Sequence, residues 1–163
     1  MSRFLHALPV ACLVLAAACE QPAQPTVATP EPALRSTENS RDFGDYVVHY
    51  NALNTNLIPP TVAQGYGIQR SSSRALVNIT VLKKVMDTPG TPVSAKISAS
   101  GTNLTGQRRE IEIREIQDPE GAIYYIGEFP VHNLETYNFT VQVSVEGEQE
   151  PLMVKFRQQF YTE

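Results

Sequence analysis

The sequence predicts an all-β fold, an immunoglobulin-like antiparallel β-sandwich of roughly seven or eight strands, preceded by a signal peptide and a flexible linker. Three observations carry this prediction. Apolar and polar residues alternate with a period of two along most of the chain after residue 42. Clusters of Pro, Gly, Asp and Ser interrupt the alternation about every ten to fifteen residues. The only helical pattern is a single short turn, so helices cannot supply the core.

A bacterial lipoprotein leader opens the chain. Met1 to Arg3 is basic, residues 4–15 are an apolar run, and Ala16-Ala17-Ala18-Cys19 is a small-residue cleavage signal that ends in cysteine. The apolar run is shorter than the roughly 20 residues that span a bilayer. We expect residues 1–18 to be removed as a signal peptide and Cys19 to carry lipid. The alternative is an ordinary cut after Ala18, which would release a soluble periplasmic protein.

A flexible Pro-rich linker is predicted over residues 19–41. Pro22, Pro25, Pro30 and Pro32 stand there among Gln, Ala, Thr and Ser, with few large apolar residues to bury. Such a tether reaches about 30–60 Å. Glu20 follows the cysteine instead of the aspartate that retains lipoproteins in the inner membrane. We therefore expect an outer-membrane lipoprotein that faces the periplasm.

Strands are expected throughout the remaining domain, residues 42–163. The segment from Tyr46 to Tyr50 opens it, and the more continuously apolar segment from Ala122 to Phe129 is predicted as a central strand. The other alternating segments predict half-buried strands over 77–81, 93–100, 111–114, 137–145 and 152–160. Turns are expected at 88–92, 100–101, 118–121 and 146–148.

Three local features complete the predicted domain. The segment 59–67 has proline at its start and glycine at its end, which predicts a single helical turn. Tyr137 begins a strong strand, where a tyrosine often caps a sandwich edge by bonding to upstream backbone. Of Tyr124 and Tyr125, one is expected in the core and the other on the surface, as an aromatic of the kind that interfaces use.

Composition excludes several kinds of function. The 163 residues carry a net charge of −4 and show no basic stripe, which argues against nucleic-acid binding. Of two cysteines, Cys12 lies in the leader and Cys19 is reserved for lipid, so the domain has no disulfide and no thiolate. His49 and His132 show no metal-ligand spacing. We expect no metal and no cofactor.

One loop is a candidate binding element. Ser71-Ser72-Ser73 lies between Arg70 and Arg74 and has no nucleophile-elbow motif around it. The arginines and hydroxyls suit an anion. The possible binding surface predicted around this loop comprises His49, Asn51, Tyr66, Arg70 and Arg74. The Asn-x-Ser/Thr pattern of glycosylation sites occurs three times, at Asn78, Asn103 and Asn138. Because the leader is of bacterial type, we interpret these asparagines as ordinary polar residues of strands and loops.

Five segments of the domain resemble a known family. They are Tyr46–Asn51, Gly67–Ser71, Asn103–Gln107, Ala122–Phe129 and Phe156–Tyr161. The resemblance spans residues 42–161 and is to an uncharacterised family of proteobacterial envelope proteins, domain of unknown function number 4426. It implies a small exported domain of a Gram-negative bacterium. It implies no activity and no catalytic residues.

The expected function is that of a lipid-anchored, non-enzymatic envelope module that binds another protein or a cell-wall component. An alternative is a periplasmic protein that binds a small ligand or anion through the Arg70–Arg74 loop. A further alternative is a hydrolase with an atypical site. It would need His49 or His132 beside a carboxylate and a hydroxyl in one cleft.

Overall fold

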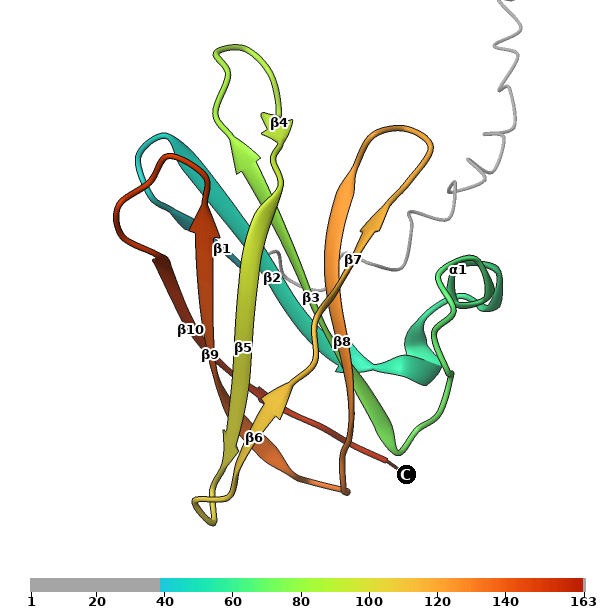
Figure 1. Cartoon of the computed structure of the whole chain (residues 1–163). Coiled ribbons are helices and arrows are strands. Elements are labelled where there is room, and N and C mark those ends of the chain that lie inside the picture. Colours follow the sequence, from blue (N-terminus) through green and yellow to red (C-terminus); the bar gives the residue numbers. More distant parts are fainter. Residues whose placement is uncertain (1–38, 163) are drawn as a thin grey trace, which may run out of the picture.

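The computed structural model describes residues 39–162, which form two antiparallel sheets packed face to face (Figure 1). The predicted signal peptide, Cys19 and most of the predicted linker lie outside the described residues. No helix in the described part of the chain is long and apolar enough to cross a membrane. The predicted all-β antiparallel sandwich is confirmed.

The two sheets differ in size. The larger has the spatial order β1 (Asn39–Asp42), β2 (Tyr46–Asn54), β3 (Arg74–Lys83), β8 (Ile123–Pro130) and β7 (Arg114–Gln117), with β4 (Thr91–Pro92) paired to the end of β3. The smaller has the order β10 (Leu152–Gln159), β9 (Thr136–Val145), β5 (Ala95–Asn103) and β6 (Arg108–Ile111). A 3₁₀ turn η1 (Thr55–Leu57) and the helix α1 (Pro60–Gly65) connect β2 to β3.

The described residues form ten strands, more than the seven or eight expected, because β1, β4, β6 and β7 have only two to four residues each. The predicted linker also ends earlier than residue 41. β1 starts at Asn39, and its residues from Asn39 to Asp42 pair with β2 from Tyr50 to Val47. Backbone groups make this ladder, so no apolar alternation marks the strand in the sequence.

The core lies between the sheets. The side chains of Phe139 and Phe160 are 1% exposed there. The ring of Phe129 meets the ring of Phe139 edge to face, with centroids 5.7 Å apart. Tyr137 joins this cluster, where burial raises its pKa and hydrogen bonding to Glu135 raises it further. Tyr137 thus packs in the core, and its hydroxyl interacts with the side chains of Glu135 and Arg109.

The predicted strand around Ile111–Arg114 is divided between the sheets. β6 ends at Ile111 in the smaller sheet, and β7 begins at Arg114 in the larger one. The crossing segment passes directly over Gly127 of β8, where an added Cβ would lie 2.8 Å from Glu112 O. Glu110 therefore lies in β6, while Glu112 lies in the crossing between the two sheets.

The predicted turn at Ser100-Gly101 is also wrong, since both residues lie inside β5. A Cβ on Gly101 would lie 3.0 Å from Tyr137 Cδ1 and 3.1 Å from Phe139 Cε1. Gly101 thus makes room for core rings on β9. The chain turns later, around Gly106, whose φ is +85°.

Candidate functional site

A segment between β2 and β3, residues 55–73, covers part of the outer face of the larger sheet. We call this segment the strap. The predicted helical turn within it is confirmed as α1, with Pro60 in its first turn. Ile58 and Ala63 of the strap are 3% and 2% exposed and pack against Leu76 and Ile126 of the sheet. Figure 1 shows α1 beside the sandwich, outside the space between the two sheets.

The two ends of the strap are tied together by hydrogen bonds. Thr55 is fully buried, and its Oγ1 lies 2.8 Å from Gln69 O and accepts a bond from Ser71 N–H at 2.9 Å. Asn54 Nδ2 donates to Ser72 O at 2.7 Å. These bonds close the base of the strap and fix where it meets the sheet.

A pocket lies between the strap and the sheet, and we call it the strap pocket. Its volume is about 170 Å³. The strap contributes Ile58, Val62, Tyr66 and Ile68, and the sheet contributes Leu53, Leu76, Asn78, Tyr124 and Ile126. Asn78 is the one amide among these lining residues. Its Oδ1 is buried and has no hydrogen-bond partner among the described residues.

Two tyrosines belong to the lining of the strap pocket. The rings of Tyr66 and Tyr124 are 6.1 Å apart between centroids and tilted by 43°. Burial raises the pKa of Tyr124, and the negative charge of Asp118 adds to this effect. Tyr124 therefore stays a neutral phenol at ordinary pH.

A charged cluster joins the strap to the sheet near Tyr66. The Glu128 side chain, 16% exposed, has Oε2 3.6 Å from Arg74 Nε and Oε1 3.7 Å from Arg114 Nη2. Glu128 Oε2 also accepts a hydrogen bond from Gln69 N–H at 3.3 Å. Arg114 Nη2 donates to Tyr66 O at 2.7 Å. The carboxylate of Glu128 on β8 and the guanidinium of Arg114 on β7 therefore hold the strap against the sheet.

The domain can be compared with known proteins. Residues 40–163 match the family model described as domain of unknown function DUF4426. The chain belongs to this family. A solved structure of a DUF4426 family protein from Pseudomonas aeruginosa PAO1 is 34% identical, covers 76% of this chain and 94% of that chain, and superposes with a TM-score of 0.65. No curated protein matches this chain. The resemblance noted in the sequence is thus confirmed.

The predicted binding residues of this DUF4426 domain share one side of the molecule without forming one site. Tyr66 lines the strap pocket. Asn51 pairs with Asn78, so it adjoins the pocket through β2. His49 pairs with Thr80, which is six residues from Arg74 on β3, or about 20 Å along the strand. His49 is therefore too far from Arg74 to share a small ligand with it.

The Arg70–Arg74 loop is engaged with the protein itself. Arg70 Nη2 donates to Asn56 O at 2.6 Å, and Arg74 lies beside Glu128. The hydroxyls of Ser71 and Ser73 bond to each other at 2.9 Å. Any anion would have to compete with these internal partners.

Sequence reasoning missed the lining residues that come from the sheet. Leu76, Asn78 and Ile126 all point to the outer face, which antiparallel sheets often leave wet. A signal was present, because both parities of residues 75–79 and 122–129 carry apolar side chains. Of the two tyrosines at 124 and 125, Tyr125 is 3% exposed in the core, while Tyr124 lies on the outer face and is half-buried beneath the strap.

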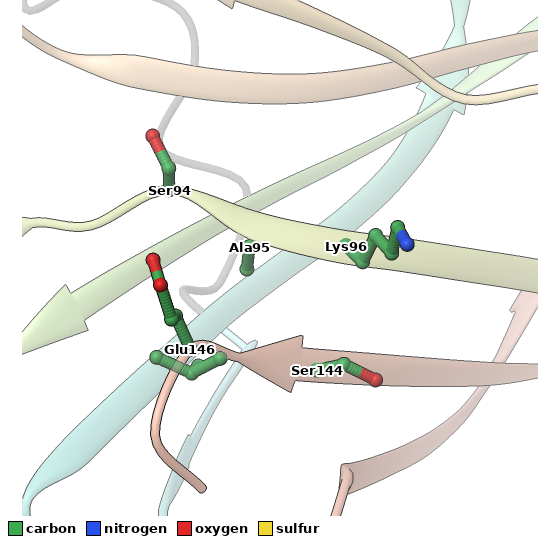
Figure 2. A pocket seen from close by; sticks show the side chains of 6 residues that line it. Ser94, Ala95, Lys96, Ser144 and Glu146 are labelled. Carbon is green, nitrogen blue, oxygen red and sulfur yellow. The ribbon is translucent and has the colours of Figure 1, made fainter.

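Residues 39–162 contain no set of three or more His, Asp or Glu side chains placed to hold a metal. A second hollow lies over the start of β5 and the end of β9 (Figure 2). Ser94, Lys96 and Glu146 line it, but it is more open than the strap pocket and no orphaned polar atom faces it. The strap pocket is therefore the stronger candidate site.

Proposed function

We propose that the mature protein is a lipid-anchored, non-enzymatic binding module of the bacterial envelope, and that the strap pocket is its ligand site. The observation that carries this proposal is the pocket itself. Its lining is almost wholly apolar, and a single buried amide oxygen is left for a ligand to satisfy. Concave apolar sites with few polar groups are the usual form of ligand sites.

Binding is a better account of this site than catalysis. Nucleophilic or acid–base chemistry needs a base within hydrogen-bond reach of the group it activates. The lining residues of the strap pocket include no carboxylate, histidine, serine or lysine. An amide and two phenol groups can orient a ligand through hydrogen bonds, but none of them is a side chain suited to act as a general base.

The leader supports attachment to the envelope. Lipid on Cys19 and outer-membrane sorting would place the folded domain in the periplasm, held off the membrane by the segment before β1. Mass spectrometry of the mature N-terminus tests this part of the proposal. A thioether-linked lipid on Cys19, lost in Cys19→Ser, is the expected result. A mature chain that begins at unmodified Cys19, or that keeps Met1, would contradict it.

Partner capture tests binding in the envelope. Crosslinking in intact cells should recover a partner or cell-wall fragment with the native protein and lose it with Val62→Trp, which adds bulk to a half-buried side chain that lines the strap pocket. A matched Ser94→Trp control places similar bulk at an exposed position that lines the second hollow. Equal capture by both variants would show that the strap pocket is not the binding site.

A further inference from the structure

The amide of Asn78 is placed where an ordinary core would have an apolar side chain. Its neighbours in the strap pocket are aliphatic or aromatic, and its Oδ1 has no hydrogen-bond partner within residues 39–162. A buried acceptor without a donor destabilises the fold. Such a group in a folded domain calls for an explanation, and a donor supplied by a bound molecule is one that fits an acceptor facing a pocket.

We propose that the strap pocket binds a single aromatic ring that carries one hydrogen-bond donor, a phenol-type group, with the donor directed to Asn78 Oδ1. This inference rests on the proposed function, because it assumes that the strap pocket is the ligand site. It adds the chemical class of the ligand.

The size of the pocket fits one ring. Its volume is about 170 Å³. An apolar cavity of about 150 Å³ lined by Leu, Ile and Phe is known to bind benzene. The walls here are of the same kind, with leucine, isoleucine and valine side chains around the amide. A fused bicyclic ring would have to push the strap outward.

The walls also favour an aromatic ligand over an aliphatic one. Tyr66 and Tyr124 belong to the lining, and their rings are tilted by 43°. A ligand ring gains from offset or edge-to-face contact with such rings beyond the area it buries. Tyr66 comes from the strap and Tyr124 from β8, so a ligand ring in the pocket could contact both.

The polar group of the ligand must be a neutral donor. An amide oxygen accepts hydrogen bonds and repels a carboxylate or phosphate oxygen. A charged head buried among aliphatic side chains would lose its hydration without an ion partner, because the guanidinium of Arg114 is directed to Tyr66 O and Glu128. A phenolic O–H satisfies the acceptor and carries no charge.

Three probes of equal ring size test the donor. p-Cresol, toluene and 4-methylanisole share a methylated ring and differ in having a hydroxyl, a hydrogen or a methoxy group. Binding to the full mature protein is measured by amide chemical shifts in two-dimensional NMR. We expect p-cresol to bind about tenfold or more tightly than the other two, and to shift the amides of residues 58–68 and 76–78.

The variant Asn78→Leu separates the donor from the cavity. It removes the acceptor and keeps a side chain of the same branched shape, so the preference for p-cresol over toluene should vanish. Asn138→Leu makes the same change on an exposed position of β9 and should leave the preference unaltered. A preference that survives in Asn78→Leu would overturn the inference.

The outcomes separate this inference from the proposed function. If toluene and p-cresol bind equally well to the native protein, the donor inference is wrong and the pocket stands as a ligand site. If none of the three probes binds, the donor inference and the assignment of the strap pocket as the ligand site are both wrong. A capped tyrosine dipeptide that outcompetes p-cresol supports the phenol class with a protein partner as its source. A dipeptide that does not compete supports a free small molecule.

Discussion

Substituting Gly127 with alanine should destabilise the domain, although alanine is normally the better residue in an ordered chain. Gly127 lies in β8, and its φ is not in the left-handed region. Alanine can therefore adopt the backbone conformation without strain. Restricting the unfolded chain would then contribute about 0.4–1 kcal/mol in favour of folding. Whether the variant is more or less stable than the native domain then depends on how much room a Cβ has at Gly127.

The space at Gly127 is already occupied. An added Cβ would lie 2.5 Å from Ile111 Cγ2, 2.7 Å from Ile113 Cδ1 and 2.8 Å from Glu112 O. The side chains could rotate away, but Glu112 O is backbone between two strands that are each fixed by a ladder. Overpacking costs typically about 1–3 kcal/mol, and a backbone contact belongs at the upper end. After the entropic gain, we expect a net loss of about 1–2 kcal/mol in the free energy of unfolding.

Urea unfolding followed by circular dichroism measures this loss. Gly65→Ala is the matched control, because nothing lies within 4 Å of a Cβ at Gly65 and its φ is not positive. Gly65 ends α1, where we expect alanine to stabilise by a few tenths of a kcal/mol to about 1 kcal/mol. If Gly127→Ala were as stable as the native domain at an unchanged m-value, the close crossing of the β6–β7 segment over β8 would be refuted.

Three further predictions concern the strap and the buried tyrosines. Asn78→Leu should raise the free energy of unfolding by about 1–3 kcal/mol, because it removes an unsatisfied buried acceptor; a lower urea midpoint would contradict this. Glu128→Gln should weaken the hold of the strap, so that hydrogen exchange of residues 58–68 accelerates while that of β9 does not change. Burial chiefly raises the pKa values of Tyr124, Tyr125 and Tyr137, so the unfolded state loses phenolic protons first. The stability that these groups contribute is present below pH 10 and is lost as pH rises through their folded values. Tyr137→Phe should make the urea midpoint fall less steeply between pH 9 and 11, and an unchanged slope would count against this.

Sequence patterns predicted the long strands better than the short ones. Alternation over 137–145 and 152–160 corresponds closely to β9 and β10, because side chains that face the core must be apolar at every second position. β1 and β4 have no such pattern, since they lie at sheet edges and are held by backbone pairing. The Ser100-Gly101 pair suggests a turn, because glycine is common in turns. Glycine also occurs inside strands where a neighbouring side chain approaches the backbone closely. The rings of Tyr137 and Phe139 show that the second reason applies here.

The candidate site was predictable only in part. The helical turn α1 follows from local sequence, while Tyr66 lines the strap pocket and Asn51 adjoins it by pairing with Asn78. The sequence grouped Arg70 and Arg74 with these residues as an anion loop, but their partners Asn56 and Glu128 come from the other end of the strap and from another strand. Such distant pairing leaves no mark in local spacing.

The sequence alone determined that this protein has an all-β domain, and it predicted an export leader. Both depend on the order of apolar and polar residues along the chain, which sets strand faces and leader hydrophobicity locally. Only the tertiary structure decided that the strap folds onto the larger sheet and that Asn78 lies beneath it. The strap pocket joins residues from β2, β3, β8 and the strap, which are separated by up to about seventy positions. Such contacts form only when the strap packs on the sheet. The pocket that they enclose therefore cannot be read from the order of apolar and polar residues along the chain.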